Sequence, residues 1–202
     1  KQFHIINHSA PRIDGIDKVT GRARYAADVS YPFMAYGAML RLENVPSAQI
    51  RSIDASRALA LPGVLAVLTA ADMPKTKSWA SYRYLTDRVR YVGDVIALIA
   101  AETRELAEEA KKLIRVEYDI LPAVFDVREA QKPGAHTVLE EYPDNRFTPS
   151  RYTLKKGDPE AGFAEADFII EREYETQYVE HAYIEPEAAV AFENPSNGEM
   201  TV

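Results

Sequence analysis

The side chains best suited to bind a metal ion lie close together near the C-terminal end. His181, Glu185 and Glu187 would share one face of an extended segment, because side chains alternate between the two faces of a strand. In a helix, His181 and Glu185 would lie about one turn apart, which also allows an imidazole and a carboxylate to bind one metal ion. The structural alternative is that these side chains form hydrogen bonds across an interface. The spacing alone leaves both interpretations open.

Asp94 and Glu102 are the candidates for acid–base chemistry. Two carboxylates in one cleft can act as general bases. Asp94 also follows Gly93 directly, and an aspartate beside a glycine is typical of a turn. We therefore predict a turn at Asp94, with a catalytic pair as the alternative.

Residues 75–91 combine aromatic and basic side chains at close spacing. Aromatic rings interleaved with cations can bind single-stranded nucleic acid by stacking, and both residue types are enriched at contacts between proteins. The formal net charge of −7, from 31 acidic and 24 basic residues, argues against a nucleic-acid partner. A partner interface and an ordinary surface loop remain. The residues concerned are Lys75, Lys77, Trp79, Tyr82, Arg83, Tyr84, Arg88, Arg90 and Tyr91.

The composition of the 202 residues excludes several kinds of site. No cysteine is present, so the chain by itself holds no iron–sulfur cluster, thiolate zinc site or cysteine nucleophile. The longest apolar run, residues 95–101, is far shorter than the ~20 residues of a membrane-spanning helix. The absence of disulfides fits a cytoplasmic protein. We therefore expect a cytoplasmic protein without a membrane span.

Hydrophobic periodicity predicts strands and helices in the first two thirds of the chain. The clearest unit is a β-α-β succession over residues 91–121, in which a largely apolar strand at 92–101 precedes a helix capped by Thr103. The charged face of that helix, residues 104–112, is interpreted as a solvated surface. Hairpin-like turns are predicted at Asp14-Gly15 and Thr20-Gly21. Further strands are predicted at 23–29, 36–42, 48–53, 64–69 and 115–119, and a short helix at 54–61.

The last third of the chain has a different character. Residues 136–150 are polar and interrupted by proline, which predicts a linker. After it we predict a helix at 158–166 with Asp158 as its N-cap, a hairpin turn at Asn197-Gly198, and strands at 152–154, 167–178 and 188–193. The chain starts without methionine and stops inside this hairpin. We therefore expect it to be a piece of a longer protein.

Four blocks of the sequence resemble one enzyme family. The first is the run from Arg12 to Asp28, which contains Val19-Thr20-Gly21-x-Ala23-x-Tyr25-x-x-Asp28. The others are built around Pro62-Gly63-Val64, Arg90-Tyr91-Val92-Gly93-Asp94, and Gly157-Asp158 with His181-x-x-x-Glu185-Pro186. In this order they resemble the start of the molybdenum-binding large subunit of the xanthine dehydrogenase/aldehyde oxidase family.

The resemblance implies a fold and a reaction. The fold class would be α+β, with a mixed-sheet hammerhead domain and packed helices at 1–135, a linker at 136–150, and the first strands of the molybdopterin-binding domain at 151–202. The complete enzyme would be a molybdenum-dependent oxidoreductase that hydroxylates an aldehyde or a nitrogen heterocycle with oxygen from water. Electrons would pass to [2Fe-2S] clusters and FAD on partner domains or subunits.

The resemblance also implies that the reactive centre lies outside these residues. In the family, the glycine-rich loop around the molybdopterin, a glutamine near the metal and the catalytic glutamate all follow the region matched here. None has a counterpart in this chain, in which no two glycines are adjacent. We therefore assign no catalytic, cofactor-binding or metal-binding residue, expect the chain alone to be inactive, and interpret His181, Glu185 and Glu187 as interface residues.

The expected role is structural, with partner docking. The partners would be the remainder of the molybdenum subunit and the iron–sulfur and flavin subunits or domains. One alternative is a free-standing, non-catalytic interaction module or split subunit. Another is the same subunit type in a carbon monoxide dehydrogenase or an aromatic-thioester reductase.

Overall fold

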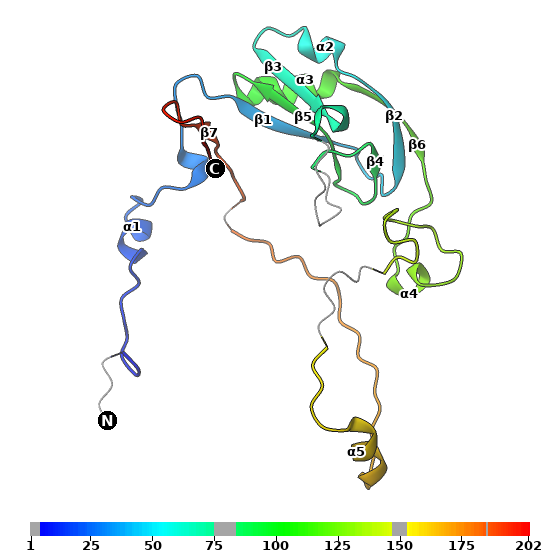
Figure 1. Ribbon diagram of the computed structural model, residues 1–202. Coiled ribbons are helices and arrows are strands. Elements are labelled where there is room, and N and C mark those ends of the chain that lie inside the picture. The colour runs from blue at the N-terminus through cyan, green and yellow to red at the C-terminus, as the bar shows by residue number, and fades with distance from the viewer. Residues whose placement is uncertain (1–4, 75–83, 147–152, 185) are drawn as a thin grey trace. The chain divides into compact units, whose positions relative to one another are not determined.

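The computed structural model describes residues 5–74, 84–146, 153–184 and 186–202 (Figure 1). The chain divides into two units. One is Phe33–Lys156, and the other combines the two ends, Lys1–Pro32 and Gly157–Val202. Two three-stranded sheets lie in the first unit, and a two-stranded ladder lies in the second. Among the described residues, no helix is long and apolar enough to cross a membrane.

The first sheet has the strand order β1-β5-β3, with β1 at Tyr36–Arg41, β5 at Val95–Ala101 and β3 at Val64–Thr69. Every residue of β5 is apolar, and the strand has a neighbour on each side. Its central position explains why its sequence lacks the alternation of a half-exposed strand. Helix α3 (Arg104–Leu113) packs against this sheet (Figure 1).

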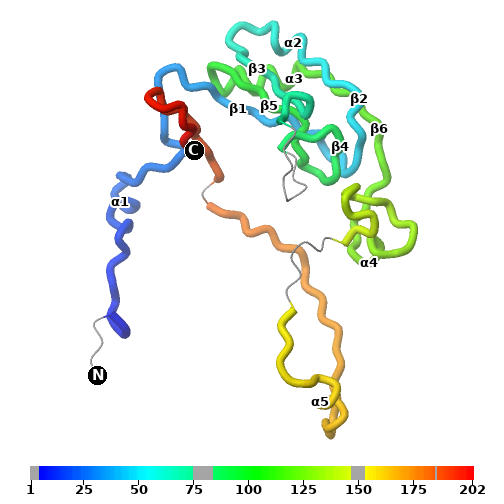
Figure 2. The backbone as a smooth tube through the Cα atoms, in the orientation of Figure 1, coloured from blue at the N-terminus to red at the C-terminus, as the bar shows by residue number. Residues whose placement is uncertain are grey.

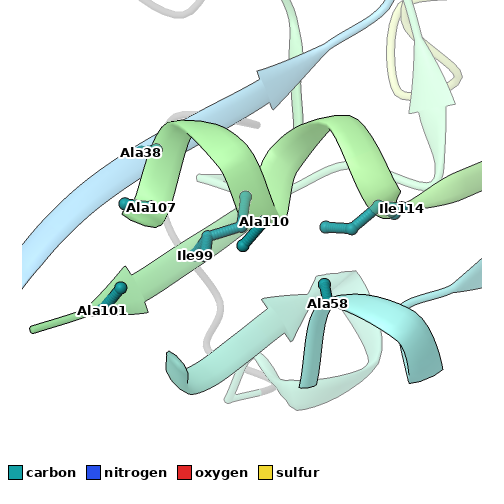
Figure 3. Close-up of a cluster of buried hydrophobic side chains, with 7 residues drawn as sticks. All are labelled: Ala38, Ala58, Ile99, Ala101, Ala107, Ala110 and Ile114. Carbon is teal, nitrogen blue, oxygen red and sulfur yellow. The ribbon is translucent and has the colours of Figure 1, made fainter. Parts of the chain in front are cut away.

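Small side chains form the core between α3 and the first sheet. Helix α3 begins where predicted, because the side-chain oxygen of Thr103 accepts the N–H of Leu106 at 3.1 Å. Figure 3 shows Ala107 and Ala110 of α3 beside Ile99 of β5. Alanine on the inner face lets the helix backbone approach the strand closely. The buried cluster consists of Ala38, Ala58, Ile99, Ala101, Ala107, Ala110 and Ile114.

The second sheet has the order β4-β2-β6, with β4 at Arg88–Val89, β2 at Ala48–Asp54 and β6 at Arg115–Ile120. Ile96 of β5 is fully buried with Ala48 and Val89, so the two sheets share a core. The predicted β-α-β succession is present. Its two strands nevertheless belong to different sheets, and α3 carries the chain from one sheet to the other.

The remaining elements are short. They are α1 (Gly15–Val19), a 3-10 helix (Ala26–Asp28), α2 (Ser56–Leu59), a 3-10 helix (Ala70–Asp72), α4 (Val127–Ala130), α5 (Pro159–Glu165), β7 (Phe192–Glu193) and β8 (Met200–Thr201). The α+β class is confirmed. The ladders of the described residues are all antiparallel, where a mixed sheet was expected.

Local hydrogen bonds explain why the structure near the N-terminus differs from two of the predictions. The strand predicted at 23–29 is wrong, because the Asp28 carboxylate accepts the N–H of Tyr25 at 3.0 Å and closes a 3-10 turn. The residues between the predicted turns form α1. There Asp14 pairs with Lys18 at 2.8 Å, a spacing of four residues that suits a helix.

The C-terminal segment has fewer strands than predicted. The predicted helix is present as α5, capped by Asp158, and the hairpin at Asn197-Gly198 pairs β7 with β8. Residues 167–178 follow α5 as extended backbone without a ladder among the described residues (Figure 2). The strand predicted at 188–193 is confined to β7, and Thr153 and Leu154 belong to no strand. Residues with the side-chain pattern of a strand form a ladder only where a second strand is present to pair with them.

Candidate functional site

Arg88 and Arg90 converge on one carboxylate, that of Glu140. Arg88 Nη1 donates to Glu140 Oε1, and Arg90 Nη2 donates to Oε2 at 2.9 Å. The two arginine side chains are 18% and 13% exposed, whereas that of Glu140 is 49% exposed. Each carboxylate oxygen therefore serves a different arginine, which fixes the orientation of the carboxylate as well as its position.

The backbone around β4 holds the two guanidinium groups in place. The buried Thr86 hydroxyl donates to the carbonyl oxygen of Arg88 at 2.6 Å and accepts the Arg88 N–H at 3.0 Å. Arg90 Nη1 donates to the same carbonyl oxygen at 2.7 Å and to Thr86 Oγ1 at 2.9 Å. Arg90 is thus anchored by Thr86 and Arg88, independently of Glu140.

The pKa of Glu140 reflects a competition between burial and the arginines. Partial burial alone would raise the pKa of the carboxyl group. A hydrogen bond from Arg90, one from its own backbone, and the charges of Arg90 and Arg88 act against burial and hold the pKa of Glu140 at about 2. Glu140 is therefore ionised at neutral pH.

A hollow of about 420 Å³ lies beside this cluster, lined by Gln49, Asp87, Arg88, Arg90, Glu140 and Glu141. Three of the lining residues are acidic, and both guanidinium groups already bind Glu140. A free anion would have to displace Glu140 and approach two further acidic residues. The lining therefore does not suit an anion, and the arginines act within the chain.

Residues 130–146 fold into a closed loop around Asn145. Asn145 Nδ2 donates to the carbonyl oxygens of Ala130 at 3.0 Å and His136 at 2.9 Å, and Oδ1 accepts the N–H of Val138 at 2.8 Å. Arg88 contacts the same loop, because its Nη2 donates to the carbonyl oxygen of Thr137 at 3.1 Å. The prediction for 136–150 did not contain this loop. The signal for it was Asn145, since asparagine tolerates the left-handed backbone that it adopts here, with φ 56.

The structure separates the proposed acid–base pair. Asp94 precedes the seven-residue strand β5 and Glu102 follows it, so the two are roughly 20 Å or more apart at ~3.3 Å per residue. Asp94 instead accepts the N–H of Arg90 at 3.1 Å beside Gly93, whose φ is +107. Burial raises the pKa of Asp94, while the hydrogen bond and charge of Arg90 act in the opposite direction. The predicted turn at Asp94 is confirmed.

His181 does not take part in a metal site among the described residues. Residues 178–184 form no helix, so the helical spacing of His181 with Glu185 does not apply, and Glu185 itself lies outside the described residues. The ring of His181 stacks on Tyr183 with 5.7 Å between centroids. In the part of the chain that the structure describes, no three histidine or acidic side chains are placed to hold a metal ion.

The aromatic and basic residues of 75–91 that the structure describes lie in different environments. Arg88 and Arg90 point into the cluster described above, whereas Tyr84 and Tyr91 are 78% and 51% exposed. The guanidinium groups of this stretch that the structure describes are therefore not available to phosphates. Lys75, Lys77, Trp79, Tyr82 and Arg83 lie outside the described residues.

Comparison with protein families identifies the chain. Residues 20–122, just over half of it, match the a/b hammerhead domain of aldehyde oxidase and xanthine dehydrogenase. The chain belongs to the aldehyde oxidase and xanthine dehydrogenase family. Residues 138–202 match the molybdopterin cofactor-binding domain. The family predicted from the four sequence blocks is confirmed.

Two bacterial relatives show how much of a family member the chain represents. It is 32% identical to the nicotinate dehydrogenase large molybdopterin subunit of Eubacterium barkeri, over 100% of this chain and 47% of that protein. It is 39% identical to a probable xanthine dehydrogenase subunit of Bacillus subtilis, over 96% of this chain and 26% of that protein. The chain thus spans about half of the first relative and about a quarter of the second.

Solved structures of the family share the fold. The aldehyde oxidoreductase of Desulfovibrio gigas matches 78% of this chain and 19% of its own length, with 29% identity and a TM-score of 0.62. A copper- and molybdenum-containing carbon monoxide dehydrogenase matches 79% of this chain and 22% of its own length, with 32% identity and the same TM-score.

Within 138–202, the start of α5 does not fit the phosphate of a molybdopterin. A phosphate needs backbone N–H groups that converge on it. At the start of α5, the Asp158 carboxylate already accepts the N–H groups of Glu160 at 3.1 Å and Ala161 at 3.2 Å. A carboxylate at this position repels a second anion.

Proposed function

We propose that the chain is the N-terminal, hammerhead-bearing part of the large subunit of a molybdenum hydroxylase, and that its own role is structural. The proposed limits are a hammerhead domain at 1–135, a connecting segment at 136–150 and part of the molybdopterin-binding domain at 151–202. The order of the two family matches along the chain supports this assignment. We assign no catalytic, cofactor-binding or metal-binding residue to the chain.

The observation that carries the proposal is the exposed apolar side of residues 167–178. Four of the six side chains at alternate positions from 168 to 178 are Phe168, Ile170, Tyr174 and Tyr178, which are 90%, 80%, 87% and 99% exposed; the other two are Arg172 and Thr176. Side chains at alternate positions of an extended segment share one face. A strand with one apolar face becomes stable only against a sheet and a core. We infer that the rest of the molybdopterin-binding domain provides both.

The complete enzyme would hydroxylate an aldehyde or a nitrogen heterocycle. Water would supply the oxygen atom, and the two electrons released would pass through [2Fe-2S] clusters to FAD on partner domains or subunits in the cytoplasm. Bound molybdopterin would supply the metal chemistry. The relatives named above for nicotinate, xanthine and carbon monoxide have similar identities to this chain, so the proposal names a reaction class.

The test is a measurement on the purified chain. We expect no molybdenum by mass spectrometry and no oxidation of xanthine or an aldehyde with an artificial electron acceptor. Hydrogen exchange should show unprotected amides at 167–178, because these residues form no ladder. Turnover by the chain alone, or a stoichiometric amount of molybdenum, would overturn the proposal.

The nucleotide sequence after codon 202 separates the proposal from the main alternative. Continuation into a glycine-rich segment supports a molybdenum subunit. A stop codon there favours a free-standing interaction module or a split subunit.

A further inference from the structure

Residues 130–146 lead from the segment that matches the hammerhead domain into the segment that matches the molybdopterin cofactor-binding domain. We propose that this connection is a latched loop: Asn145 closes it, and Glu140 fastens it to Arg88 and Arg90. The latch holds the connection beside β4, at one edge of the second sheet. The latch concerns the conformation of the connection and is independent of the reaction that the complete enzyme performs.

The closure of the loop rests on the Asn145 side chain. Its donors and acceptor bind the backbone at three places, of which Ala130 lies 15 residues away. A second contact crosses the loop, because Thr137 Oγ1 donates to the carbonyl oxygen of Pro143 at 3.2 Å. Loops of up to about 16 residues whose ends meet and whose own side chains fill them are compact surface elements rather than flexible linkers.

The fastening rests on one arginine that is held independently of the loop and on one that is not. Arg90 is fixed by Thr86 and by the backbone of Arg88, whereas the Arg88 guanidinium donates to the loop itself, at Glu140 and at the carbonyl oxygen of Thr137; both guanidinium groups are mostly buried. Binding Glu140 therefore requires little further ordering of Arg90, which favours the bound state. The Glu140 side chain is half-exposed, so dissolved ions can weaken its two ion pairs.

Two substitutions of unchanged shape break the latch in different ways. In Glu140→Gln, one carboxylate oxygen becomes an NH₂ group, so one arginine faces a donor instead of an acceptor. In Asn145→Asp, the NH₂ group becomes an oxygen, which then faces the carbonyl oxygens of Ala130 and His136.

Two matched variants serve as controls. Glu141→Gln makes the same chemical change at the next residue, which is also exposed and forms no recorded ion pair with the arginines in the described part of the chain. Asn44→Asp makes the same change as Asn145→Asp at an exposed asparagine with the same φ of 56.

The experiment is hydrogen–deuterium exchange on the full 202-residue chain and the four variants. We expect Glu140→Gln and Asn145→Asp to speed exchange of amides in 130–146 by about tenfold, because the loop opens locally. Exchange in β5 and α3 should not change, and the two control variants should match the wild type. The proposal is overturned if Glu140→Gln leaves 130–146 as protected as before. It is also overturned if β5 and α3 lose protection equally, because the cluster would then be part of the core.

Salt gives an independent readout of the ion pairs. At 1 M NaCl the screening length falls to about 3 Å. We expect exchange of 130–146 to rise with salt in the wild type and to change little in Glu140→Gln, which lacks the charge to be screened. An equal response of both proteins would show that the ion pairs do not hold the loop.

Discussion

Replacing Gly63 by alanine tests how the loop before β3 packs against α3. Gly63 has φ +86, a left-handed conformation that costs a residue with a Cβ atom about 1–2 kcal/mol. A Cβ atom at this position would also lie 2.8 Å from Leu106 Cδ2 and 3.0 Å from Glu102 Oε2. Leu106 packs against the buried cluster of α3, so its displacement costs about 1–3 kcal/mol more. We expect Gly63→Ala to lose about 2–5 kcal/mol of unfolding free energy.

Gly134→Ala separates the two costs. Gly134 has a similar φ of +81, and a Cβ atom there meets nothing within 4 Å. We expect this variant to lose only the backbone cost of about 1–2 kcal/mol. The assay is urea unfolding followed by far-UV circular dichroism, with equal denaturant slopes as the condition for comparison. Equal losses in the two variants would refute the reasoning, because the packing of Gly63 against Leu106 and Glu102 would then contribute nothing.

Two further predictions concern the core and the Glu140 cluster. Ile99→Ala should lower the unfolding free energy by about 2–5 kcal/mol because Ile99 is 1% exposed. Leu65→Ala, at a side chain that is 55% exposed, should change the unfolding free energy by less than about 1 kcal/mol. Similar shifts of the thermal unfolding midpoint in the two variants would contradict the assignment of the core. Because the pKa of Glu140 is lowered, its stabilisation is complete above the ordinary value of 4.5 and is lost as the pH falls towards about 2. The full difference would be worth about 3 kcal/mol, and the half-exposed side chain reduces it to about 1 kcal/mol. The advantage of the wild type over Glu140→Gln in urea unfolding should therefore shrink across this acidic range, and a constant difference would show that the charge of Glu140 is not responsible.

Elements controlled by neighbouring residues were predictable from the sequence. The apolar run of β5, the Thr103 cap of α3, the Asp158 cap of α5 and the hairpin at Asn197-Gly198 all depend on residues within a few positions of each other. Helix α4 was predictable by the same logic, because Asp126 precedes Glu129 by three residues and its carboxylate accepts two backbone N–H groups at 2.8 Å.

Features that join distant residues were not predictable in this way. Glu140 lies 52 and 50 residues from Arg88 and Arg90, and no local pattern links a polar, proline-containing segment to a short strand. The distribution of β5 and β6 over two sheets also depends on pairing with β1, β3 and β2. Residues 167–178 have the side-chain pattern of a strand, but a strand also needs a neighbour to pair with.

The acidic residues of this last segment have a protective consequence. Glu171, Glu173 and Glu175 occupy alternate positions of 167–178, so in an extended chain they lie on the face opposite Phe168, Ile170, Tyr174 and Tyr178. If two copies of the segment paired in register and in parallel, each glutamate would face its own copy, and like charges directly opposite destabilise a ladder. The three glutamates thus act as gatekeepers against amyloid-like stacking of a segment whose apolar side is open to solvent.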